Sequence, residues 1–175
     1  MKKAAVAVEN HSMFKSPEQF FELFKLKKEF AINLDDLEKH YIALQSQYHP
    51  DKFVGKAPEE IAQATQNSSF INDGYNSLKD PVKRAQLLIQ HTENINDPAV
   101  LMEIMELRES IEESSDLDEL YLQVNGQIKD VESSFDEAFK SNNIEQLNKL
   151  FLKMQYLHKA KIDVKNKLCS SGENV

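Results

Sequence analysis

Apolar side chains recur at steps of three and four residues along most of this 175-residue chain. Such spacing places them on one face of an α-helix, because the helix has about 3.6 residues per turn. The clearest early example is the series Leu37, Tyr41, Leu44 and Tyr48. Only 4 glycines and 5 prolines interrupt the sequence, too few for a turn-rich sheet protein. We therefore predict an all-α fold.

Capping residues predict where the helices of the N-terminal half begin. Ser16-Pro17 is a typical start for a short helix, because the serine caps it and proline suits its first position. The next helix is capped by Asn33 or Asp35 and ends before Pro50, which disfavours helical backbone angles in the preceding residue. Pro58 begins the helix after it. These two longer helices are predicted to pack as an antiparallel hairpin.

Gly74 lies inside the second helix of this hairpin, where glycine costs about 1 kcal/mol relative to alanine. The cost indicates that another helix approaches closely there. Asp80-Pro81 begins a further short helix.

Three more helical segments follow, at about residues 98–114, 117–140 and 144–168, and they predict a three-helix bundle. Two of them carry long apolar stripes, made by Leu117, Leu120, Val124, Ile128, Val131 and Phe135, and by Leu147, Leu150, Met154, Leu157, Val164 and Leu168. The expected organisation is a tail over 1–16, a first helical domain over 17–91, a linker over 92–98, the bundle over 99–168 and a tail over 169–175.

Charge and composition exclude several kinds of partner. The formal net charge of −8 disfavours nucleic acid, whose phosphates attract cations. No window is apolar enough for a membrane span, and the apolar run near the start breaks at Glu9, short of a signal peptide. The single cysteine, Cys169, excludes an intramolecular disulfide and fits a reducing compartment. We expect a cytoplasmic protein with no membrane or nucleic-acid partner.

The sequence lacks familiar catalytic motifs. It has no phosphate-binding glycine loop, no nucleophile elbow and no Glu-x-x-His pair of the kind that builds di-iron sites in bundles. We therefore expect no catalytic residue, no cofactor and no metal site. A metal-binding helical-bundle enzyme is kept as an alternative, because the C-terminal half is rich in carboxylates.

The tripeptide His49-Pro50-Asp51 lies between the two helices of the predicted hairpin. Pro50 stiffens the turn, and the Asp51 carboxylate is suited to bind neighbouring backbone donors. His49 presents two ring nitrogens, and the sequence does not fix its tautomer. A rigid turn with a polar tip suits recognition by a partner; the alternative is a turn that only ends a helix.

The hairpin, its His-Pro-Asp loop, Ile71-Asn72-Asp73-Gly74-Tyr75-Asn76-Ser77-Leu78, Pro81 and Arg84-Ala85 together resemble a J domain. With the helical region after residue 98, the chain resembles HscB-type co-chaperones of iron–sulfur cluster assembly over about Pro17 to Leu168. The resemblance implies an N-terminal J domain that docks on a DnaK-class chaperone, such as HscA, and stimulates its ATPase.

The implied chaperone-binding residues are His49, Pro50 and Asp51, with Lys39, His40 and Lys52 nearby. Members of the family usually carry more cations on the helix that enters the loop. We therefore expect a modest, salt-sensitive affinity for the chaperone. Eukaryotic relatives often add a cysteine-bearing zinc module, which this chain lacks, so a bacterial cytoplasm is favoured over a mitochondrial matrix.

The helix predicted after residue 98 mixes apolar and acidic side chains on one strip. Its core face is expected to be Val100, Ile104, Leu107 and Ile111. Outside that face lie Leu101, Met102 and Met105, beside Glu106, Glu109 and Glu113. Thioether and leucine contacts beside carboxylates suit a partner whose apolar patch is bordered by Lys or Arg. The alternative is a broad core stripe next to a solvated face.

The resemblance favours the first of these two interpretations. The segment Leu101-Met102-Glu103-Ile104-Met105-Glu106-Leu107-Arg108-Glu109 matches the family segment that binds the cluster scaffold IscU. It implies Leu101, Met102, Met105, Glu106, Glu109 and Glu113 as scaffold-binding residues, together with Tyr156. A core position for Tyr156 is the alternative. A J-domain co-chaperone for a different client is the nearest rival function.

Overall fold

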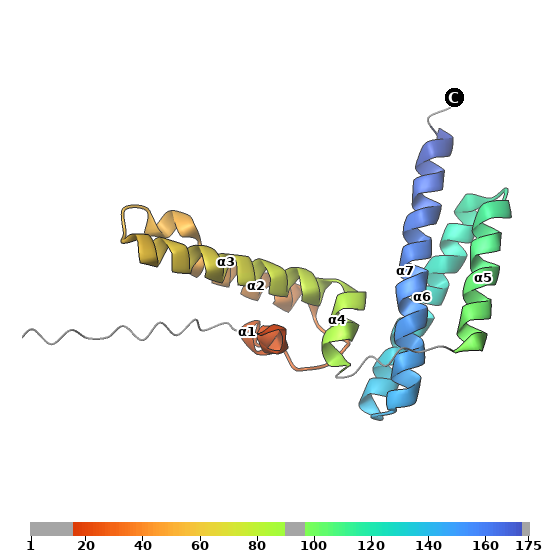
Figure 1. Ribbon diagram of the computed structural model, residues 1–175, viewed down its shortest axis with the longest axis horizontal. Coiled ribbons are helices and arrows are strands. Elements are labelled where there is room, and N and C mark those ends of the chain that lie inside the picture. The colour runs from red at the N-terminus through yellow and green to blue at the C-terminus, as the bar shows by residue number, and fades with distance from the viewer. Residues whose placement is uncertain (1–15, 90–96, 173–175) are drawn as a thin grey trace, which may run out of the picture. The chain divides into compact units, whose positions relative to one another are not determined.

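The computed structural model describes residues 16–89 and 97–172, and these residues confirm the all-α prediction (Figure 1). They form seven α-helices and two short 3₁₀ segments, and no strand occurs among them. The described residues form two compact units: one combines those up to Lys27 with Asn33–Lys79, and the other combines Lys28–Ile32 with those from Asp80 onward. The predicted N-terminal tail, except Ser16, and most of the predicted linker lie outside the described residues.

The first unit contains the predicted hairpin. Its elements are η1 (Pro17–Gln19), α1 (Phe20–Leu23), α2 (Leu34–Tyr48), η2 (Pro50–Phe53) and α3 (Pro58–Lys79). Helices α2 and α3 lie side by side, joined by the loop that contains η2 (Figure 1). The side chain of Asn33 accepts the backbone N–H of Asp35 at 2.9 Å, so Asn33 is the cap of α2.

An aromatic cluster fixes one end of this hairpin. Phe20 and Phe24 are buried, and both contact α3 at Gly74. A Cβ atom at Gly74 would lie 2.8 Å from the Phe20 ring and 2.9 Å from the Phe24 ring. The prediction of a close approach at Gly74 is confirmed, because only a residue without a side chain fits there. The other buried apolar residues of this unit are Phe21, Leu37, Ala64, Ile71 and Leu78.

Farther toward the loop, α2 and α3 meet through polar groups. The Tyr41 hydroxyl donates to Asn72 Oδ1 at 3.0 Å, and Gln45 Nε2 donates to the same oxygen at 2.5 Å. Ser68 Oγ donates in turn to Gln45 Oε1 at 3.1 Å. We call these four residues the polar seam. The seam pairs the polar side chains of α2 and α3 with one another.

The second unit consists of α4 (Pro81–Leu88), α5 (Pro98–Glu113), α6 (Leu117–Lys140) and α7 (Ile144–Gly172), with Lys28–Ile32 packed on it. Helices α5, α6 and α7 form the predicted bundle (Figure 1). Helix α7 continues to Gly172, past Leu168 where the predicted helix ended, because no helix-breaking residue occurs before that glycine.

The apolar stripes of α6 and α7 form the core of the bundle. On α6, Leu120, Val124, Ile128, Val131, Phe135 and Ala138 are buried. On α7, the buried apolar residues are Leu147, Phe151, Met154, Leu157, Ala160 and Val164. Leu117, Leu150 and Leu168, which were expected on these faces, are half-buried. The three- and four-residue spacing therefore predicted the buried faces of both helices.

Helix α4 packs with the second unit, although the sequence assigned residues 81–91 to the first domain. The Arg84 guanidinium lies 4.9 Å from the centre of the Phe30 ring, and that ring lies 4.8 Å from the Phe135 ring of α6. Burial lowers the pKa of Arg84 from its ordinary value. Because Phe30 and Arg84 are far apart in the sequence, no local pattern indicates this contact. The domain boundary near residue 91 stays a prediction.

Candidate partner-binding surfaces

The His-Pro-Asp corner, made by His49, Pro50 and Asp51, lies where α2 ends. His49 has extended backbone angles (φ −63°, ψ 131°), as expected for a residue before proline. Its N–H still donates to the Gln45 carbonyl at 2.9 Å, which completes the last turn of α2. The side chain of His49 is 51% exposed and that of Asp51 is 86% exposed. The corner is therefore fixed through its backbone and open at its side chains.

A local hydrogen bond sets the tautomer of His49. The backbone N–H of Asp51 donates to His49 Nδ1 at 3.3 Å. Since Nδ1 accepts this bond, the proton of the neutral ring is on Nε2, and no described residue accepts it. With a neutral His49 ring, the corner thus offers a partner the Nε2–H donor of His49 and the carboxylate of Asp51.

The predicted role of the Asp51 carboxylate in binding backbone donors is wrong. No backbone N–H among the described residues donates to it, and one of its oxygens lies 3.5 Å from His49 Nδ1. The 3₁₀ turn after Pro50 directs the N–H of Asp51 itself back to the histidine ring.

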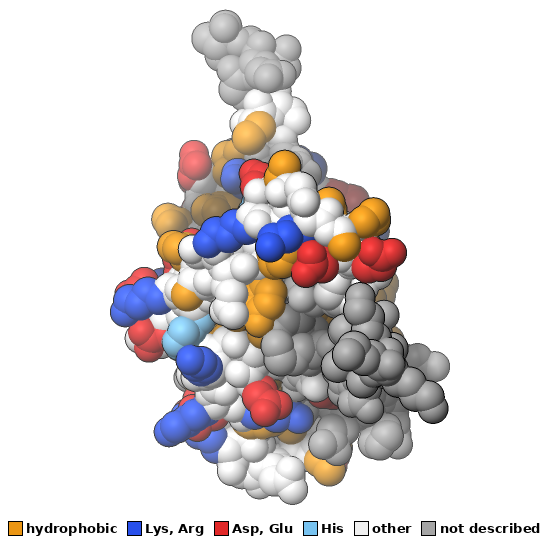
Figure 2. Space-filling model, turned by 90° about the vertical axis from the view of Figure 1, so that its left-hand side faces the viewer, with side chains coloured by type: hydrophobic (Ala, Val, Ile, Leu, Met, Phe, Trp, Pro, Cys, Tyr) orange, Lys and Arg blue, Asp and Glu red, His pale blue; other side chains and the backbone are white. Residues whose placement is uncertain are grey.

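The other residues proposed for chaperone binding differ in exposure. Lys39 and Lys52 are exposed, whereas His40 is half-buried. Lys39 Nζ lies 3.1 Å from Asp36 Oδ1, which reduces the positive potential of this part of α2. Figure 2 faces the side toward which the hairpin loop extends, and it shows basic side chains interspersed with acidic and apolar ones. Among the side chains visible on this face, the cations are not gathered into one large patch.

The strip predicted on α5 lies in solvent. Met102 and Met105 are 65% and 63% exposed. Glu106, Glu109 and Glu113 are exposed, and Leu101 is half-buried. On the core face of α5, Val100, Ile104 and Ile111 are buried, and Leu107 is half-buried. The interpretation of the methionines as part of a broad core stripe is wrong. We call these residues, Leu101, Met102, Met105, Glu106, Glu109 and Glu113, the methionine–glutamate strip.

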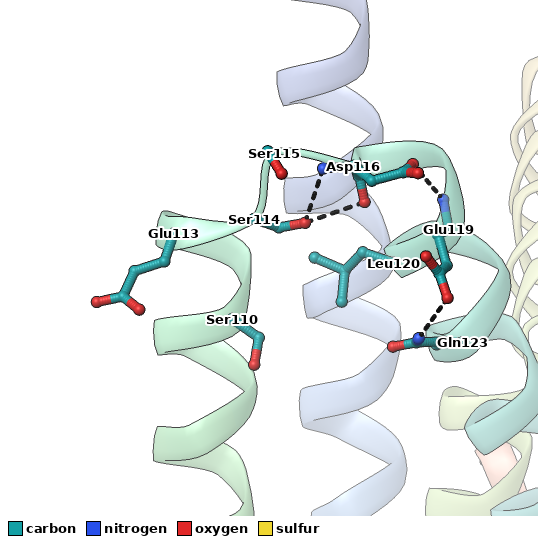
Figure 3. Close-up of a pocket in the computed structure, with 8 residues that line it drawn as sticks. All are labelled: Ser110, Glu113, Ser114, Ser115, Asp116, Glu119, Leu120 and Gln123. Atoms are coloured by element: carbon teal, nitrogen blue, oxygen red, sulfur yellow. Dashed lines mark hydrogen bonds between the residues drawn. The ribbon is translucent and has the colours of Figure 1, made fainter.

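The turn between α5 and α6 follows the C-terminal end of the methionine–glutamate strip (Figure 3). Ser114 Oγ accepts the Asp116 N–H at 3.2 Å and donates to the Asp116 carbonyl at 3.0 Å. The Asp116 carboxylate caps α6 by accepting the Glu119 N–H at 2.9 Å. The Glu113 side chain is directed away from α6 (Figure 3). The hydrogen bonds of Ser114 and Asp116 thus stabilise the turn, and the Glu113 side chain remains exposed for a partner.

Tyr156 of α7 is 36% exposed, so the core alternative for this residue is wrong. Its side chain lines a groove between α5 and α7, and Leu107 and Arg108 of α5 are among the other residues that line it. Sequence reasoning missed this groove and its basic residues, Arg108 and Lys159. Helical periodicity assigns residues to faces of one helix, and it does not show which faces of two helices lie together.

Two structural findings bear on the alternatives. Within residues 16–89 and 97–172, no three His, Cys, Asp or Glu side chains gather closely enough to hold a metal ion. None of the described helices combines the length and the apolar composition that a membrane crossing requires.

Comparison with known proteins gives the family. The family model described as the HSCB C-terminal oligomerisation domain matches residues 96–165. A co-chaperone protein HscB homolog from Psychromonas ingrahamii is 32% identical over 159 residues, which cover 83% of this chain and 94% of the relative. The chain belongs to the HscB family of co-chaperones. An iron-sulfur cluster co-chaperone protein HscB homolog from Arabidopsis thaliana is also 32% identical over 159 residues. That match covers 85% of this chain but 63% of the plant relative.

The fold supports the same membership. The solved structure of chaperone HscB from Vibrio cholerae has a TM-score of 0.76 at 30% sequence identity, over 86% of this chain and 98% of that one. The all-α arrangement is therefore the HscB fold, with a J domain followed by a C-terminal helical bundle.

Proposed function

We propose that this HscB-family chain is a J-domain co-chaperone of iron–sulfur protein maturation. In this proposal the His-Pro-Asp corner stimulates the ATPase of a DnaK-class, HscA-like chaperone. The methionine–glutamate strip and Tyr156 bind an IscU-like cluster scaffold and deliver it to that chaperone. The observation that carries the proposal is that both sets of residues are largely exposed, each on its own compact unit.

The corner has properties that suit a contact with another protein. Its backbone is held by the proline and by the end of α2, so little conformational entropy is lost when a partner binds. It offers the His49 ring and the Asp51 carboxylate to solvent. Lys39 and Lys52 supply the nearby cations, and Lys39 is already paired with Asp36. A modest affinity that falls with added salt follows from this charge distribution.

The strip suits a partner of the opposite character. Two exposed methionines provide adaptable apolar contact, and three glutamates lie beside them on α5. A scaffold with an apolar patch bordered by Lys or Arg would match both features. Because one chain then holds scaffold and chaperone together, the second contact becomes intramolecular and its effective concentration rises. The family relatives from bacteria support a bacterial cytoplasmic location as part of the same proposal.

The decisive experiment measures the ATPase of the partner chaperone with the scaffold present. Wild-type protein should stimulate the ATPase, and the variant His49→Gln should not. Because His49 is exposed, this substitution should leave the fold intact. Equal stimulation by the two proteins would remove the proposed role of the corner.

The double variant Leu101→Ala, Met105→Ala provides the complementary control. It should still stimulate the chaperone alone, but it should lose binding to the scaffold. If this variant binds the scaffold as well as wild type does, a J-domain co-chaperone for a different client becomes the better description.

A further inference from the structure

The groove between α5 and α7 has an apolar floor and a charged rim. Ile104 and Ile111 of α5 and Ala160 of α7 are each less than a tenth exposed and form the floor. The volume of the groove is about 130 Å³. A cavity of about 150 Å³ admits one benzene ring, so this groove has the size for one aliphatic or aromatic side chain. Its walls include the half-buried Leu107 and the exposed Tyr156.

The rim differs in charge from the methionine–glutamate strip on the same helix. Arg108 of α5 and Lys159 of α7 are exposed and line the groove, with Asp163 also on α7. Neither cation forms an ion pair or hydrogen bond with any described residue. By contrast, Lys153 of α7 forms an ion pair with Glu103 of α5. The groove therefore presents two cations that the described part of the bundle leaves unpaired.

We propose that this groove is a second contact for the scaffold, which inserts one apolar side chain between α5 and α7 and pairs a neighbouring carboxylate with Arg108 and Lys159. The inference rests on the proposed function and extends it. Charge complementarity favours that carboxylate, because the residues that line the groove include two cations and one aspartate. Tyr156 joins the two contacts, since it lines the groove and is also a proposed scaffold-binding residue.

Two contacts of opposite charge would orient the bound scaffold. The strip favours a part of the scaffold where cations surround an apolar patch. The groove favours a part where an anion lies beside a protruding apolar side chain. A scaffold docked in a reversed orientation would bring like charges together at both places, which costs free energy.

The test measures scaffold affinity for Arg108→Gln, Lys159→Gln and for a matched control, Lys129→Gln, Lys165→Gln. Both double variants remove two exposed cations, so they change the net charge equally. We expect the groove variant to bind the scaffold roughly three- to tenfold more weakly, as two lost ion pairs at a surface imply. The control variant should bind as wild type does. Methyl NMR on wild type should show shifts at Ile104 and Ile111 when the scaffold is added.

Three outcomes would overturn the inference. The first is wild-type affinity in the groove variant, the second an equal loss in the groove and control variants, and the third unshifted floor methyl signals in the complex. If Leu101→Ala, Met105→Ala abolishes binding in the same assay, each of these outcomes leaves the proposed function standing. If wild-type protein itself does not bind the scaffold, the proposed function fails and the groove contact fails with it.

Discussion

The helix pair α2–α3 and the helix pair α6–α7 are held together by different chemistry. Near the loop, α2 and α3 meet through the polar seam of Tyr41, Gln45, Ser68 and Asn72, and Leu37 is the only residue of α2 that is buried. Helix α6 buries six apolar side chains, from Leu120 to Ala138. A hydrogen bond contributes about 1 kcal/mol net, whereas a buried apolar side chain contributes about 1.5–3 kcal/mol.

The two helix pairs therefore differ in what their contacts contribute: the register of the helices in α2–α3, and stability in α6–α7. Hydrogen bonds of the seam fix the register of α2 against α3 and so place the His-Pro-Asp corner, but they stabilise the pair weakly. The apolar core of α6 and α7 stabilises the bundle strongly and supports the surfaces of α5. We therefore expect the hairpin near its loop to open locally at a lower free energy than the bundle does.

The largest expected effect tests this contrast directly. Phe135 of α6 is fully buried, so Phe135→Ala should lower the free energy of unfolding by about 3–5 kcal/mol through lost burial and the cavity left behind. Tyr41→Phe removes one hydroxyl of the seam, keeps the ring stacked on Tyr75, and should cost about 0.5–1.5 kcal/mol. Urea denaturation of both variants measures the difference. Equal losses would mean that the seam stabilises the protein as much as the core does.

A middle-sized effect compares two glycines, one in each unit. Alanine at Gly74 would meet the buried rings of Phe20 and Phe24, so Gly74→Ala should destabilise the protein by about 1–3 kcal/mol. Alanine at Gly126 of α6 would meet no atom within 4 Å, so Gly126→Ala should stabilise it by up to about 1 kcal/mol. Thermal unfolding followed by circular dichroism gives both signs. Stabilisation by Gly74→Ala would show that the aromatic cluster can move aside.

The smallest effect concerns pH and the caps of the two units. The backbone N–H of Val100 is the main cause that lowers the pKa of Asp97, the cap of α5, and Lys149 lowers it further. A lowered pKa in the folded state means that this carboxylate stabilises the bundle above its unfolded pKa of about 3.9. The stabilisation is lost as the pH falls through the lowered folded value. Asn33, the cap of α2, does not titrate.

Asp97→Asn should therefore be less stable than wild type at pH 7 and should approach wild-type stability near pH 3, because asparagine keeps the cap without the charge. Urea midpoints at the two pH values measure this convergence. A constant difference between the two proteins across this range would show that the charge of Asp97 contributes nothing.

Local rules predicted most of the elements of this fold. Pro50, Pro58 and Pro81 mark helix boundaries because proline acts on its own backbone and on that of its neighbours. Angular spacing put Met102 and Met105 off the core face of α5 but left a broad core stripe as an alternative, and the family resemblance favoured the exposed strip that the structure has. Gly74 was informative because a glycine inside a helix carries a cost that needs a tertiary reason.

Those local rules do not predict contacts between segments that are distant in the sequence. The stacking of Arg84 on Phe30 joins α4 to the second unit, and the sequence gives no sign of it. The groove needs Arg108 and Lys159 from two helices, and their pairing depends on how α5 packs on α7. At the His-Pro-Asp corner, the geometry of a 3₁₀ turn brings the Asp51 N–H to the His49 ring, and residue types alone do not reveal that geometry.

The polar seam also has a thermal consequence. Exposure of apolar surface raises the heat capacity, whereas exposure of polar surface lowers it. Separation of α2 from α3 near the loop exposes the amide and hydroxyl groups of the seam with fewer buried apolar side chains than the bundle has, so we expect a smaller heat-capacity change and an enthalpy that varies less with temperature. Unfolding of the bundle follows a strongly curved stability profile, because α6 and α7 expose hydrocarbon. Between cold and warm growth conditions, the fraction of molecules with an opened hairpin tip should therefore change more gradually than the fraction with an unfolded bundle.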